Sequence, residues 1–467
     1  MEIGFVTGDA SLRNTLVGVR SNQSRRNEAH VAQSVSVGPK QEPQSAAGAR
    51  TLLVSSSIGS LVEWYDFFVF ASAAALVFDR VFFPAVDPRI GVLFSLMTYA
   101  VGFVTRPLGG VVFGVLGDRF GRKRVLVWSL MLMGVATMGV GLLPGYARIG
   151  LLAPLLLVVL RLIQGLAVGG EVGGALLLVA ESLPAPQRGF WTAWPMIGGP
   201  AGNVLSSIVL ASLGVWVGET AFAAWGWRVA FLASGLLIGV GIWMRTRVAE
   251  SPIYRAYAAR RVRAPAPSLW PTLLSHWRAV LTVLLVKAAE NALFYVFTTF
   301  YIVYVTRVLH QPRTLALEAA ALGSIADVVA IFAAGSLSDR VGRLPVTIVG
   351  LLGAAAWSFV LFPMTASGAV PAIMTAAAIG GVCHGVIVGG MSAFFVELFP
   401  TSVRYTGFSI GYQIATVFTG ALAPLIGVAL LNAYGSTLPV SLYAAAMTAP
   451  GLIALGMSSE TRGRALA

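Results

Sequence analysis

The sequence predicts an all-α polytopic membrane protein, with twelve transmembrane helices arranged as two pseudo-symmetric six-helix halves. Composition is the first reason: 57% of the 467 residues are hydrophobic and 11% are charged, which leaves too little polar surface for a soluble protein. The second is a series of apolar segments from Thr51 onward, each long enough to cross the roughly 30 Å hydrocarbon core of a bilayer. The third is a charged motif that occurs twice, half a chain apart, which is typical of secondary transporters built from two related halves.

The apolar segments define the expected helices, and polar segments separate them. The two halves, 51–246 and 279–458, are joined by a linker, 247–278, in which arginines precede prolines, so we expect a basic amphipathic helix interrupted by the prolines. Residues 1–50 are predicted to be a disordered cytoplasmic tail, and residues 459–467 a second, short one. The expected spans cover residues 51–79, 91–116, 124–143, 152–180, 189–214, 228–246, 279–306, 317–337, 345–364, 371–397, 405–431 and 440–458.

The distribution of basic residues predicts the orientation. With both termini in the cytoplasm, 23 of the 32 Lys and Arg residues lie on the cytoplasmic side and six on the opposite side, as the positive-inside rule requires. The net charge of +13 therefore indicates membrane topology and contact with an anionic inner leaflet, and not nucleic-acid binding. We expect a multi-pass protein of the plasma membrane, in a bacterium the inner membrane.

The repeated charged motif lies in two short loops that face the cytoplasm in this topology. Each of its residues is displaced by 221 positions (339 − 118) between the two copies, Asp118-Arg119-x-Gly121-Arg122 and Asp339-Arg340-x-Gly342-Arg343. Glycine permits a tight turn, the Asp can accept hydrogen bonds from an Arg or a helix start, and the Arg residues can bind lipid headgroups or a carboxylate. Simple anchoring of the loops to the inner leaflet is the alternative interpretation.

The repeat also includes span 4 and span 10. Gln164-Gly165-x-x-Val168-Gly169-Gly170 matches His384-Gly385-x-x-Val388-Gly389-Gly390, and Glu181 and Arg188 match Glu397 and Arg404. The glycines recur every four residues on one helical face, which predicts a surface for close helix packing.

Several motifs together resemble the major facilitator superfamily, and within it the metabolite:proton symporter family. The motifs are the two charged loops, Glu63-Trp64-Tyr65-Asp66-Phe67-Phe68, Arg106-Pro107-Leu108-Gly109-Gly110, Arg161-x-x-Gln164-Gly165, Gly226-Trp227-Arg228, Glu250-Ser251-Pro252, Glu290-Asn291 and Glu397-Leu398-Phe399-Pro400-Thr401. The resemblance implies transport of shikimate, 2-oxoglutarate, citrate or another carboxylate, or of a zwitterion such as proline or betaine. It also implies a cytoplasmic gate, in which Asp118 meets the second half with Arg404 as one partner, and Asp339 and Arg188 form the related pair.

Buried charges in the first half predict the coupling mechanism. A charged side chain at mid-bilayer costs about 2.5–3.5 kcal/mol on insertion scales, so it persists where it has a use. Glu63 and Asp66 share one face of span 1, and two close carboxylates suit a proton carrier. Arg161 lies too far along span 4 from Glu171 to pair with it, so we expect a partner such as Asp66 or Glu63. A static ion pair is the alternative. The predicted proton-coupling residues are Glu63, Asp66, Arg161, Glu171 and Asp327.

The second half is predicted to supply substrate contacts. Lys287 can attract a substrate carboxylate, with Glu290 and Asn291 beside it, unless Lys287 and Glu290 only neutralise each other. Asp327 is either the partner of Lys287 or a second titrating group, and we expect His384 to be a hydrogen-bonded packing residue. The predicted substrate-binding residues are Tyr65, Arg161, Gln164, Lys287, Glu290, Asn291, Tyr295, Tyr412 and Gln413.

These features favour proton-coupled import of a small organic acid or zwitterion by alternating access, with a shikimate-like or dicarboxylate substrate preferred. Proton antiport, which is efflux, is the first alternative. A transporter-like sensor or a membrane enzyme is disfavoured, because the four histidines share no metal-ligand spacing and no Lys lies in a Walker-type loop. We expect no cofactor and no metal, and a monomer is sufficient.

Overall fold

A computed structural model describes residues 46–261, 269–420 and 422–466. Within these ranges the backbone is helical, with short connections and no β-strand. The predicted N-terminal tail lies outside the described residues up to position 45, and residues 46–50 form the first turns of a helix.

The first six spans form one bundle, the N-bundle. Two of these spans are interrupted by a break, and a third begins with a π-helical turn. Span 2 is broken at Thr105, and span 5 contains Pro195 at the end of its first helix. The helices are α2 (Ala46–Leu76), α4 (Pro88–Val104) with α5 (Arg106–Phe120), α6 (Arg122–Leu142), α8 (Leu152–Ser182), α9 (Arg188–Met196) with α10 (Gly198–Val217), and α12 (Trp227–Thr246), which a π-helical turn, Phe222–Gly226, precedes.

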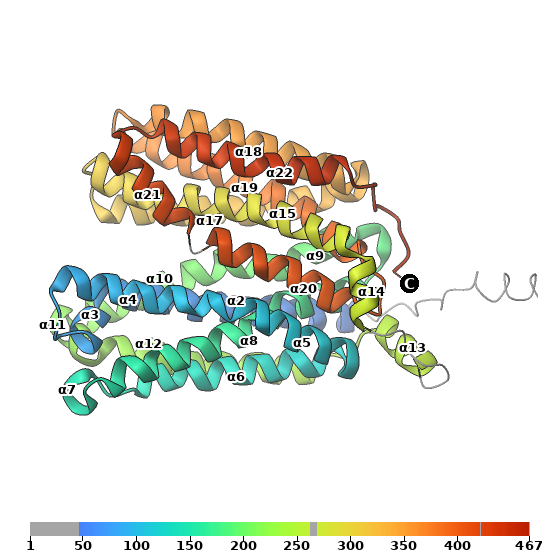
Figure 1. Ribbon diagram of the computed structural model, residues 1–467, viewed down its shortest axis with the longest axis horizontal. Coiled ribbons are helices and arrows are strands. Elements are labelled where there is room, and N and C mark those ends of the chain that lie inside the picture. Colours follow the sequence, from blue (N-terminus) through green and yellow to red (C-terminus); the bar gives the residue numbers. More distant parts are fainter. Residues whose placement is uncertain (1–45, 262–268, 421, 467) are drawn as a thin grey trace, which may run out of the picture. The chain divides into compact units, whose positions relative to one another are not determined.

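The last six spans form the C-bundle (Figure 1). Span 7 continues from α15 through two π-helical segments, Val296–Phe300 and Tyr304–Val308, and span 11 contains a third, Thr416–Gly420. The helices are α15 (Trp277–Tyr295), α16 (Tyr301–Val303), α17 (Arg313–Val341), α18 (Arg343–Thr365), α19 (Val370–Glu397), α20 (Arg404–Ala415) with α21 (Ala423–Tyr434), and α22 (Leu438–Gly456).

Short helices connect these spans. In the linker, α13 (Pro252–Arg261) and α14 (Leu269–Ser275) lie on either side of residues outside the described ranges. The predicted single amphipathic helix broken by prolines therefore corresponds, within the described residues, to two short helices. The remaining connections contain α3 (Phe78–Phe82), α7 (Tyr146–Ile149) and α11 (Glu219–Ala221).

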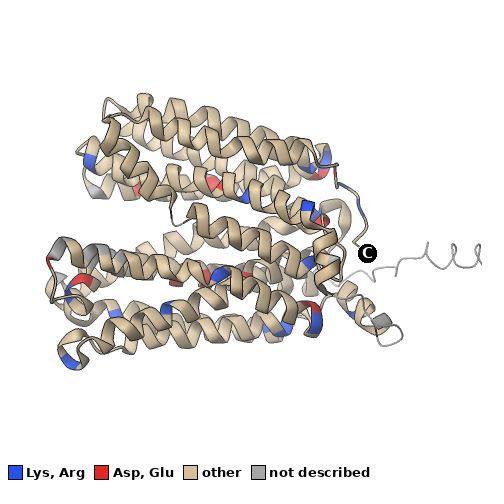
Figure 2. Cartoon of the chain, viewed as in Figure 1, with Lys and Arg blue, Asp and Glu red and all other residues tan. Residues whose placement is uncertain are grey.

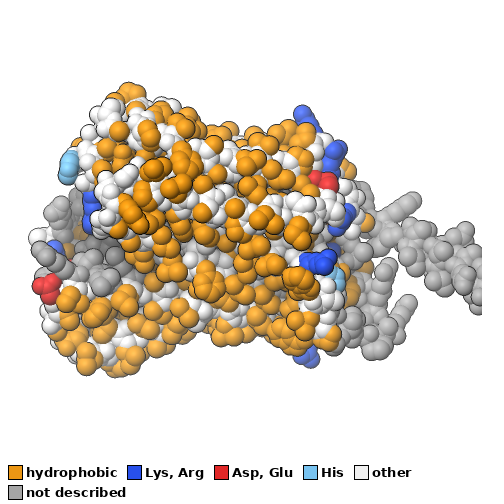
Figure 3. Space-filling view, turned by 45° about the horizontal axis from the view of Figure 1, so that its top comes forward, with side chains coloured by type: hydrophobic (Ala, Val, Ile, Leu, Met, Phe, Trp, Pro, Cys, Tyr) orange, Lys and Arg blue, Asp and Glu red, His pale blue; other side chains and the backbone are white. Residues whose placement is uncertain are grey.

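Eleven helical runs in the described part of the chain are long and apolar enough to cross a membrane. The twelfth span, α2, has 31 residues, but Glu63 and Asp66 at its centre lower its mean hydropathy. Hydrophobic side chains cover most of the face in Figure 3, while charged residues lie at the helix ends and at selected positions inside both bundles in Figure 2. The architecture is therefore the expected set of twelve helices in two halves.

The most extensive contacts between the bundles involve two helices that begin at equivalent places in the repeat. Helix α20 of the C-bundle packs on α5 and α8, and α9 of the N-bundle packs on α17 and α19. These contacts lie toward the end that holds Asp118, Arg122, Asp339 and Arg343, which we call the charged end. The linker helices α13 and α14 and the C-terminal segment lie at the same end in Figure 1.

Glycines allow the helices within and between the bundles to approach closely, as the sequence pattern indicates. A Cβ at Gly165 would lie 1.9 Å from the carbonyl oxygen of Gly102, and a Cβ at Gly381 would lie 2.0 Å from that of Gly323. Gly117 faces the ring of Tyr405 in the other bundle, and a Cβ there would lie 2.0 Å from the ring. Because no side chain fits at these distances, glycine is required for this helix packing.

Candidate functional site

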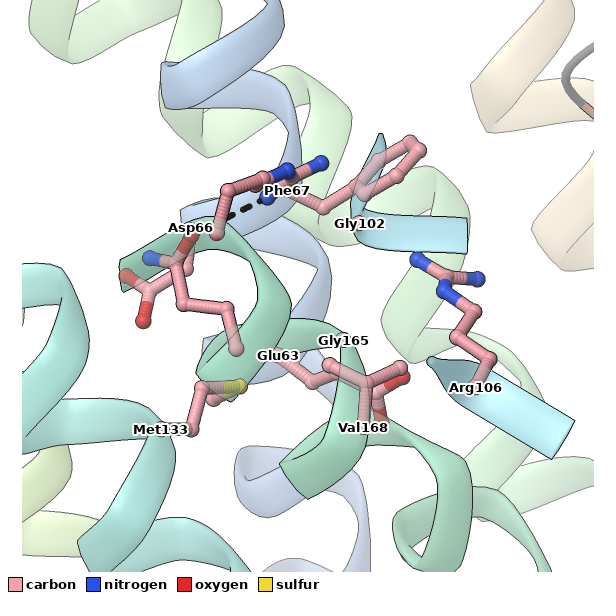
Figure 4. Close-up of a pocket in the computed structure, with 10 residues that line it drawn as sticks. Glu63, Asp66, Phe67, Gly102, Arg106, Met133, Gly165 and Val168 are labelled. Atoms are coloured by element: carbon pink, nitrogen blue, oxygen red, sulfur yellow. Dashed lines mark hydrogen bonds between the residues drawn. The ribbon is translucent and has the colours of Figure 1, made fainter. Parts of the chain in front are cut away.

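A small pocket inside the N-bundle is lined by most of the ionisable residues predicted in that half (Figure 4). The pocket has about 10 Å³ of space for the centre of a water molecule, which is close to the minimum for one water. A metabolite therefore needs these side chains to separate before it can bind. The lining residues are Glu63, Asp66, Phe67, Gly102, Arg106, Met133, Arg161, Gln164, Gly165 and Val168.

Glu63 and Asp66 bring two carboxyl groups to this pocket from α2. Their side chains are almost fully buried, with 3% and 2% of their surface exposed. Oδ2 of Asp66 accepts a hydrogen bond of 2.8 Å from the Thr137 hydroxyl, whereas Oδ1 of Asp66 and Oε2 of Glu63 have no hydrogen-bond partner within the described residues. A buried carboxylate oxygen without a partner is costly, so these atoms are well placed to carry a proton.

Arg161 reaches Asp66 through two intermediate side chains and not by the direct ion pair that the sequence suggested. Its Nη1 donates to Oε1 of Gln164 at 3.2 Å, Nε2 of Gln164 donates to the Thr137 hydroxyl at 2.8 Å, and that hydroxyl donates to Asp66. The guanidinium also lies 4.3 Å from the ring centre of Phe70 and 5.1 Å from that of Tyr99. Aromatic rings and neutral acceptors thus hold this cation without neutralising its charge.

Arg106 is a second cation of the pocket. It belongs to one of the sequence motifs but was not among the predicted site residues. Its guanidinium lies between the rings of Phe103 and Phe67, at 4.4 and 4.9 Å, and its Nε is buried with no hydrogen-bond partner in the part of the chain that the structure describes. Figure 4 shows it entering the pocket from α5, on the opposite side from Asp66 in that view. Its position at the first turn after the break in span 2, together with its charge in a predicted span, was a signal that could have identified it.

Glu171 has a different environment from the other predicted proton-coupling residues. It forms a buried ion pair with Arg245 of α12, and its Oε2 also accepts from the Ser129 hydroxyl at 3.1 Å. Arg245 additionally donates to the Leu126 carbonyl. The hydrogen-bonding capacity of Glu171 is met by a guanidinium and a hydroxyl. Glu171 therefore links its own helix, α8, to α6 and α12.

Tyr65 does not line this pocket, and its assignment to the substrate site stays a prediction. Its hydroxyl donates to the Ala230 carbonyl at 3.1 Å, and its ring is fully buried in the core of the N-bundle. One residue along an α-helix turns the side chain by about 100°, so the neighbour of Asp66 faces a different part of the bundle.

In the C-bundle, four buried ionisable residues form a continuous array. Lys287 and Glu290 of α15 form an ion pair, and Oε1 of Glu290 lies 2.9 Å from Nε2 of His384 on α19. Nδ1 of the same imidazole lies 2.9 Å from Oδ2 of Asp327 on α17. Asp327 is therefore the partner of His384 and not of Lys287. His384 is hydrogen-bonded as expected, and its two partners are both carboxyl groups.

The predicted polar contacts of the C-bundle lie around Lys287 and at the bundle interface. The Lys287 ammonium lies 4.5 Å from the ring centre of Tyr412, and Asn291 Nδ2 is 3.4 Å from the Thr416 hydroxyl. Tyr295 is buried beside Gly420 in span 11. Gln413 donates to the Gly169 carbonyl of the N-bundle at 3.1 Å, so it joins the two halves.

At the charged end, each motif Asp binds the start of a helix in the other bundle. Asp118 accepts from the backbone N–H and hydroxyl of Thr406 on α20, at 3.1 and 2.7 Å. Asp339 accepts from the backbone N–H groups of Gly189 and Phe190 on α9, at 2.8 and 2.9 Å. A carboxylate at a helix N-terminus is favourable because the first N–H groups lack intrahelical acceptors.

The motif arginines pair with two glutamates that the predicted gate did not include. Glu181 accepts from Arg404 at 2.9 Å and lies 3.4 Å from Arg122, and Glu397 accepts from Arg188 at 2.7 Å and lies 3.5 Å from Arg343. Arg122 and Arg343 also bind the Asp four residues before them. Arg404 and Arg188 thus cross between the bundles as expected, but to Glu181 and Glu397.

The remaining motif residues have the properties of a tight turn at a membrane surface. Gly121 and Gly342 have φ values of +105° and +115°, which favour glycine. Arg119 and Arg340 are exposed.

A second repeated pair, Glu250 and Glu460, supports these turns, and its second member was not predicted. Glu250 and Glu460 accept hydrogen bonds from the first N–H groups of α6 and α18, and the next residues, Ser251 and Thr461, each donate to the buried glutamates at 2.6 Å. Partial burial opposes ionisation of Glu460, but four backbone N–H donors outweigh it and lower its pKa below the ordinary range. This pair could have been recognised from the sequence, because Glu-Ser follows the last span of the first half and Glu-Thr follows the last span of the second.

Comparison with known proteins identifies the family. Residues 52–268 and 264–467 match the family described as sugar (and other) transporter. The chain is 37% identical over 442 residues to the inner membrane metabolite transport protein YhjE of Escherichia coli (strain K12), covering 93% of this chain and 100% of that protein. It is 36% identical to the shikimate transporter of the same organism (88% and 94% covered) and 31% identical to the proline/betaine transporter of Salmonella typhimurium (89% and 85% covered).

Solved structures show the same fold at lower sequence identity. The proton:xylose symporter XylE bound to 6-bromo-6-deoxy-D-glucose matches with a TM-score of 0.72 at 17% identity, covering 90% of this chain and 98% of that chain. An inward open conformation of XylE from E. coli matches with a TM-score of 0.60 at 18% identity, with the same coverage. The chain is a multi-pass membrane transporter and not an enzyme, and it belongs to the sugar (and other) transporter family of the major facilitator superfamily.

Proposed function

We propose that the protein imports a small organic acid or zwitterion together with protons, by alternating access of a central site to the two sides of the bacterial inner membrane. The observation that carries this proposal is the pocket of the N-bundle. It combines two carboxyl groups that each have an unpartnered buried oxygen with two guanidinium groups, Arg106 and Arg161, that form no ion pair within the described residues.

Each pair of groups has a separate task in this mechanism. Protonation of Asp66 or Glu63 removes a negative charge from the pocket. The positive charge of Arg106 and Arg161 is then less compensated, so these guanidinium groups attract the carboxylate of a substrate more strongly. Glu171 is omitted from the proton carriers because Arg245 already neutralises it. The substrate contacts on the C-bundle side come from Lys287, Asn291, Tyr295, Tyr412 and Gln413.

The hydrogen bonds of the charged end hold the two bundles together on one side of this site. The positive-inside rule places that end in the cytoplasm, so the arrangement corresponds to a transporter closed toward the cytoplasm. Separation of Asp118 from Thr406 and of Asp339 from Gly189 then opens the cytoplasmic side.

The relatives support a small organic acid or zwitterion as the substrate. Two of them are named as transporters of shikimate and of proline/betaine. Two cations in the pocket favour an anionic substrate, so a shikimate-like acid or a dicarboxylate is the preferred class. One chain contains both halves of the site, so a monomer is sufficient.

The test is uptake of labelled shikimate, 2-oxoglutarate, citrate, proline and betaine by proteoliposomes, with and without an inward proton gradient. We expect gradient-driven accumulation of at least one compound, and its loss in Asp66→Asn. Glu318→Gln, which changes an exposed acid on α17, is the matched control and should transport normally. Accumulation driven only by an outward proton gradient would establish antiport, and equal uptake in both conditions would reduce the protein to a facilitator.

A further inference from the structure

The C-bundle contains an acid–imidazole–acid arrangement that the transport mechanism above does not use. His384 lies between Asp327 and Glu290, with both ring nitrogens 2.9 Å from a carboxylate oxygen. The three residues come from three helices, α19, α17 and α15, and 7%, 3% and 3% of their surfaces are exposed. Phe294 packs against the imidazole at 4.8 Å between ring centres. The arrangement is therefore buried and fixed from several sides.

Its geometry determines how many protons it holds. Each of the two N···O contacts needs one proton between nitrogen and oxygen, but a neutral imidazole carries a single N–H. The three groups therefore hold one proton more than a neutral His384 with two carboxylates would. That proton resides on the imidazole or on one of the carboxyl groups. Because both ring nitrogens of His384 face carboxyl oxygens, neither nitrogen is available to bind any other group.

The neighbouring charges favour retention of this proton. Lys287 binds the second oxygen of Glu290, and the ring of Tyr412 covers the ammonium. When His384 is protonated, the net charge of the four groups is zero, because Lys287 and His384 are cations and the two acids are carboxylates. Loss of the proton leaves one net negative charge inside the bundle, where an uncompensated charge is costly.

A cavity beside the array has room for a water molecule next to Asp327 and His384. Asp327 and His384 line it together with Ser324 and Thr298, and it has about 20 Å³ of space for the centre of a water molecule, enough for one. Oδ1 of Asp327 is buried and has no hydrogen-bond partner within the described residues. A water in this cavity could therefore exchange a proton with Asp327, which passes it to His384.

We propose that His384, Asp327 and Glu290 form a second proton-binding site, separate from Asp66 and Glu63, so that each half of the transporter binds one proton. The inference rests on the proposed proton-coupled transport, and it adds the number of protons and the location of the second. The site is loaded when the charged end is closed. It discharges when movement of α15 against α19 separates Glu290 from His384.

The proton content can be measured without a substrate. The chain has four histidines, so replacement of His30, His276 and His310 by Gln leaves His384 as the only imidazole. Labelling with ring-¹⁵N histidine then makes its two ring nitrogens the only enriched ones in ¹⁵N nuclear magnetic resonance of the protein in liposomes. At pH 7 we expect either both ring nitrogens protonated, or a neutral ring accompanied by a carboxylic-acid infrared band that disappears in Asp327→Asn or Glu290→Gln. Ser336→Ala, on the same helix as Asp327 but not in the cavity lining, should leave the signals unchanged. A neutral ring without such a band would overturn the proposal.

The contribution to transport is measured by the steepness of accumulation against the pH gradient. For an uncharged complex at zero membrane potential, two protons give about 100-fold accumulation per pH unit and one proton about tenfold. We expect His384→Gln to reduce the accumulation from about 100-fold to about tenfold per pH unit. The compound tested is whichever one of the panel the wild type accumulates. An unchanged dependence would contradict the second site. If the wild type accumulates none of the compounds, the transport function itself fails, and the histidine measurement still decides whether the proton is present.

Discussion

Asp118 and Thr406 are separated by 288 positions in the chain, yet the Asp118 carboxylate accepts hydrogen bonds from both the backbone N–H and the hydroxyl of Thr406. The carboxylate also binds Arg122 of its own bundle at 2.8 Å. The Asp118 side chain thus binds both the tight turn that follows span 2 and the first turn of α20. The closed state of the charged end depends on this negative charge being present.

The first prediction concerns this contact. Asp118→Asn removes the charge that the Thr406 donors and Arg122 share, and hydrogen bonds to charged groups contribute about 1.5–3 kcal/mol. The open population at the charged end should therefore rise by about 10- to 100-fold. The measurement is the rate at which a water-soluble maleimide labels Ser409→Cys, a buried interface position, in a Cys383→Ser background. Asp79→Asn, an acid in the short helix α3, should not change the rate.

The second prediction tests the close approach of Gly117 to Tyr405. Gly117→Ala places a Cβ 2.0 Å from the Tyr405 ring, so the bundles cannot close and labelling of Ser409→Cys should increase at least tenfold. Tyr405→Ala in the same chain should restore slow labelling, because it removes the ring. Gly239→Ala, whose Cβ would meet nothing within 4 Å, is the matched control. Failure of the double variant to recover would mean that the alanine acts on α5 alone.

The third prediction assigns substrate affinity to Arg106. Arg106→Gln removes a cation that contacts two rings and forms no ion pair with a carboxylate within the described residues. The KM for uptake of an anionic substrate should therefore rise at least tenfold while the fold is retained. Arg106→Lys should recover little, because an ammonium cannot form two parallel hydrogen bonds with a carboxylate. Arg119→Gln, an exposed arginine of the charged end, provides the control. An unchanged KM in Arg106→Gln would exclude this residue from the substrate site.

The fourth prediction concerns the link between Arg161 and Asp66. Thr137→Val removes the hydroxyl that donates to Asp66 and accepts from Gln164, which leaves further buried polar atoms without partners. The cost should be about 1–3 kcal/mol in stability, seen as a lower midpoint of thermal unfolding in detergent. Thr137→Ser keeps the hydroxyl and should stay close to the wild type. Equal midpoints for the Val and Ser variants would show that the hydroxyl is not used.

The fifth prediction follows from the lowered pKa of Glu460, a group outside the membrane spans. Burial disfavours its charge, but the backbone N–H donors at the start of α18 outweigh this effect. A folded-state pKa below the ordinary value of about 4.3 means that the ionised carboxylate stabilises the fold at neutral pH, and that this contribution is lost as the pH falls through the folded value. The protection of the Arg343 and Leu344 amides against hydrogen exchange, measured relative to an unstructured peptide at the same pH, should therefore fall below about pH 4. In Glu460→Gln this protection should be low already at pH 6 and should change little with pH.

The sequence predicts the fold well because the signals for a span are local. Length and hydropathy locate each helix, and the 221-residue repeat relates the halves; even α2, which its own acids make less apolar, was placed. The breaks in spans 2, 5, 7 and 11 were not predicted. A π-helical turn or a break at Thr105 depends on packing against neighbouring helices, which a hydropathy pattern does not contain.

The site was predicted in part, because sequence identifies which helix carries a charge but not what lies across from it. Asp66 and Arg161 do line one pocket, but the expected pair is bridged by Gln164 and Thr137. His384 was assigned to packing because its two acids come from spans 7 and 8, far from it in the chain. Such pairings become visible only when three helices are placed side by side.

The two crossing carboxylates give the molecule a property of symmetric dimers. Asp118 meets the start of α20 in the same way that Asp339 meets the start of α9, so each bundle offers the other one acceptor and one helix start. This is the reciprocal contact by which two identical subunits associate around a two-fold axis. Here a single chain contains both partners, so every substitution at the charged end has an internal duplicate against which its effect can be compared in the same molecule.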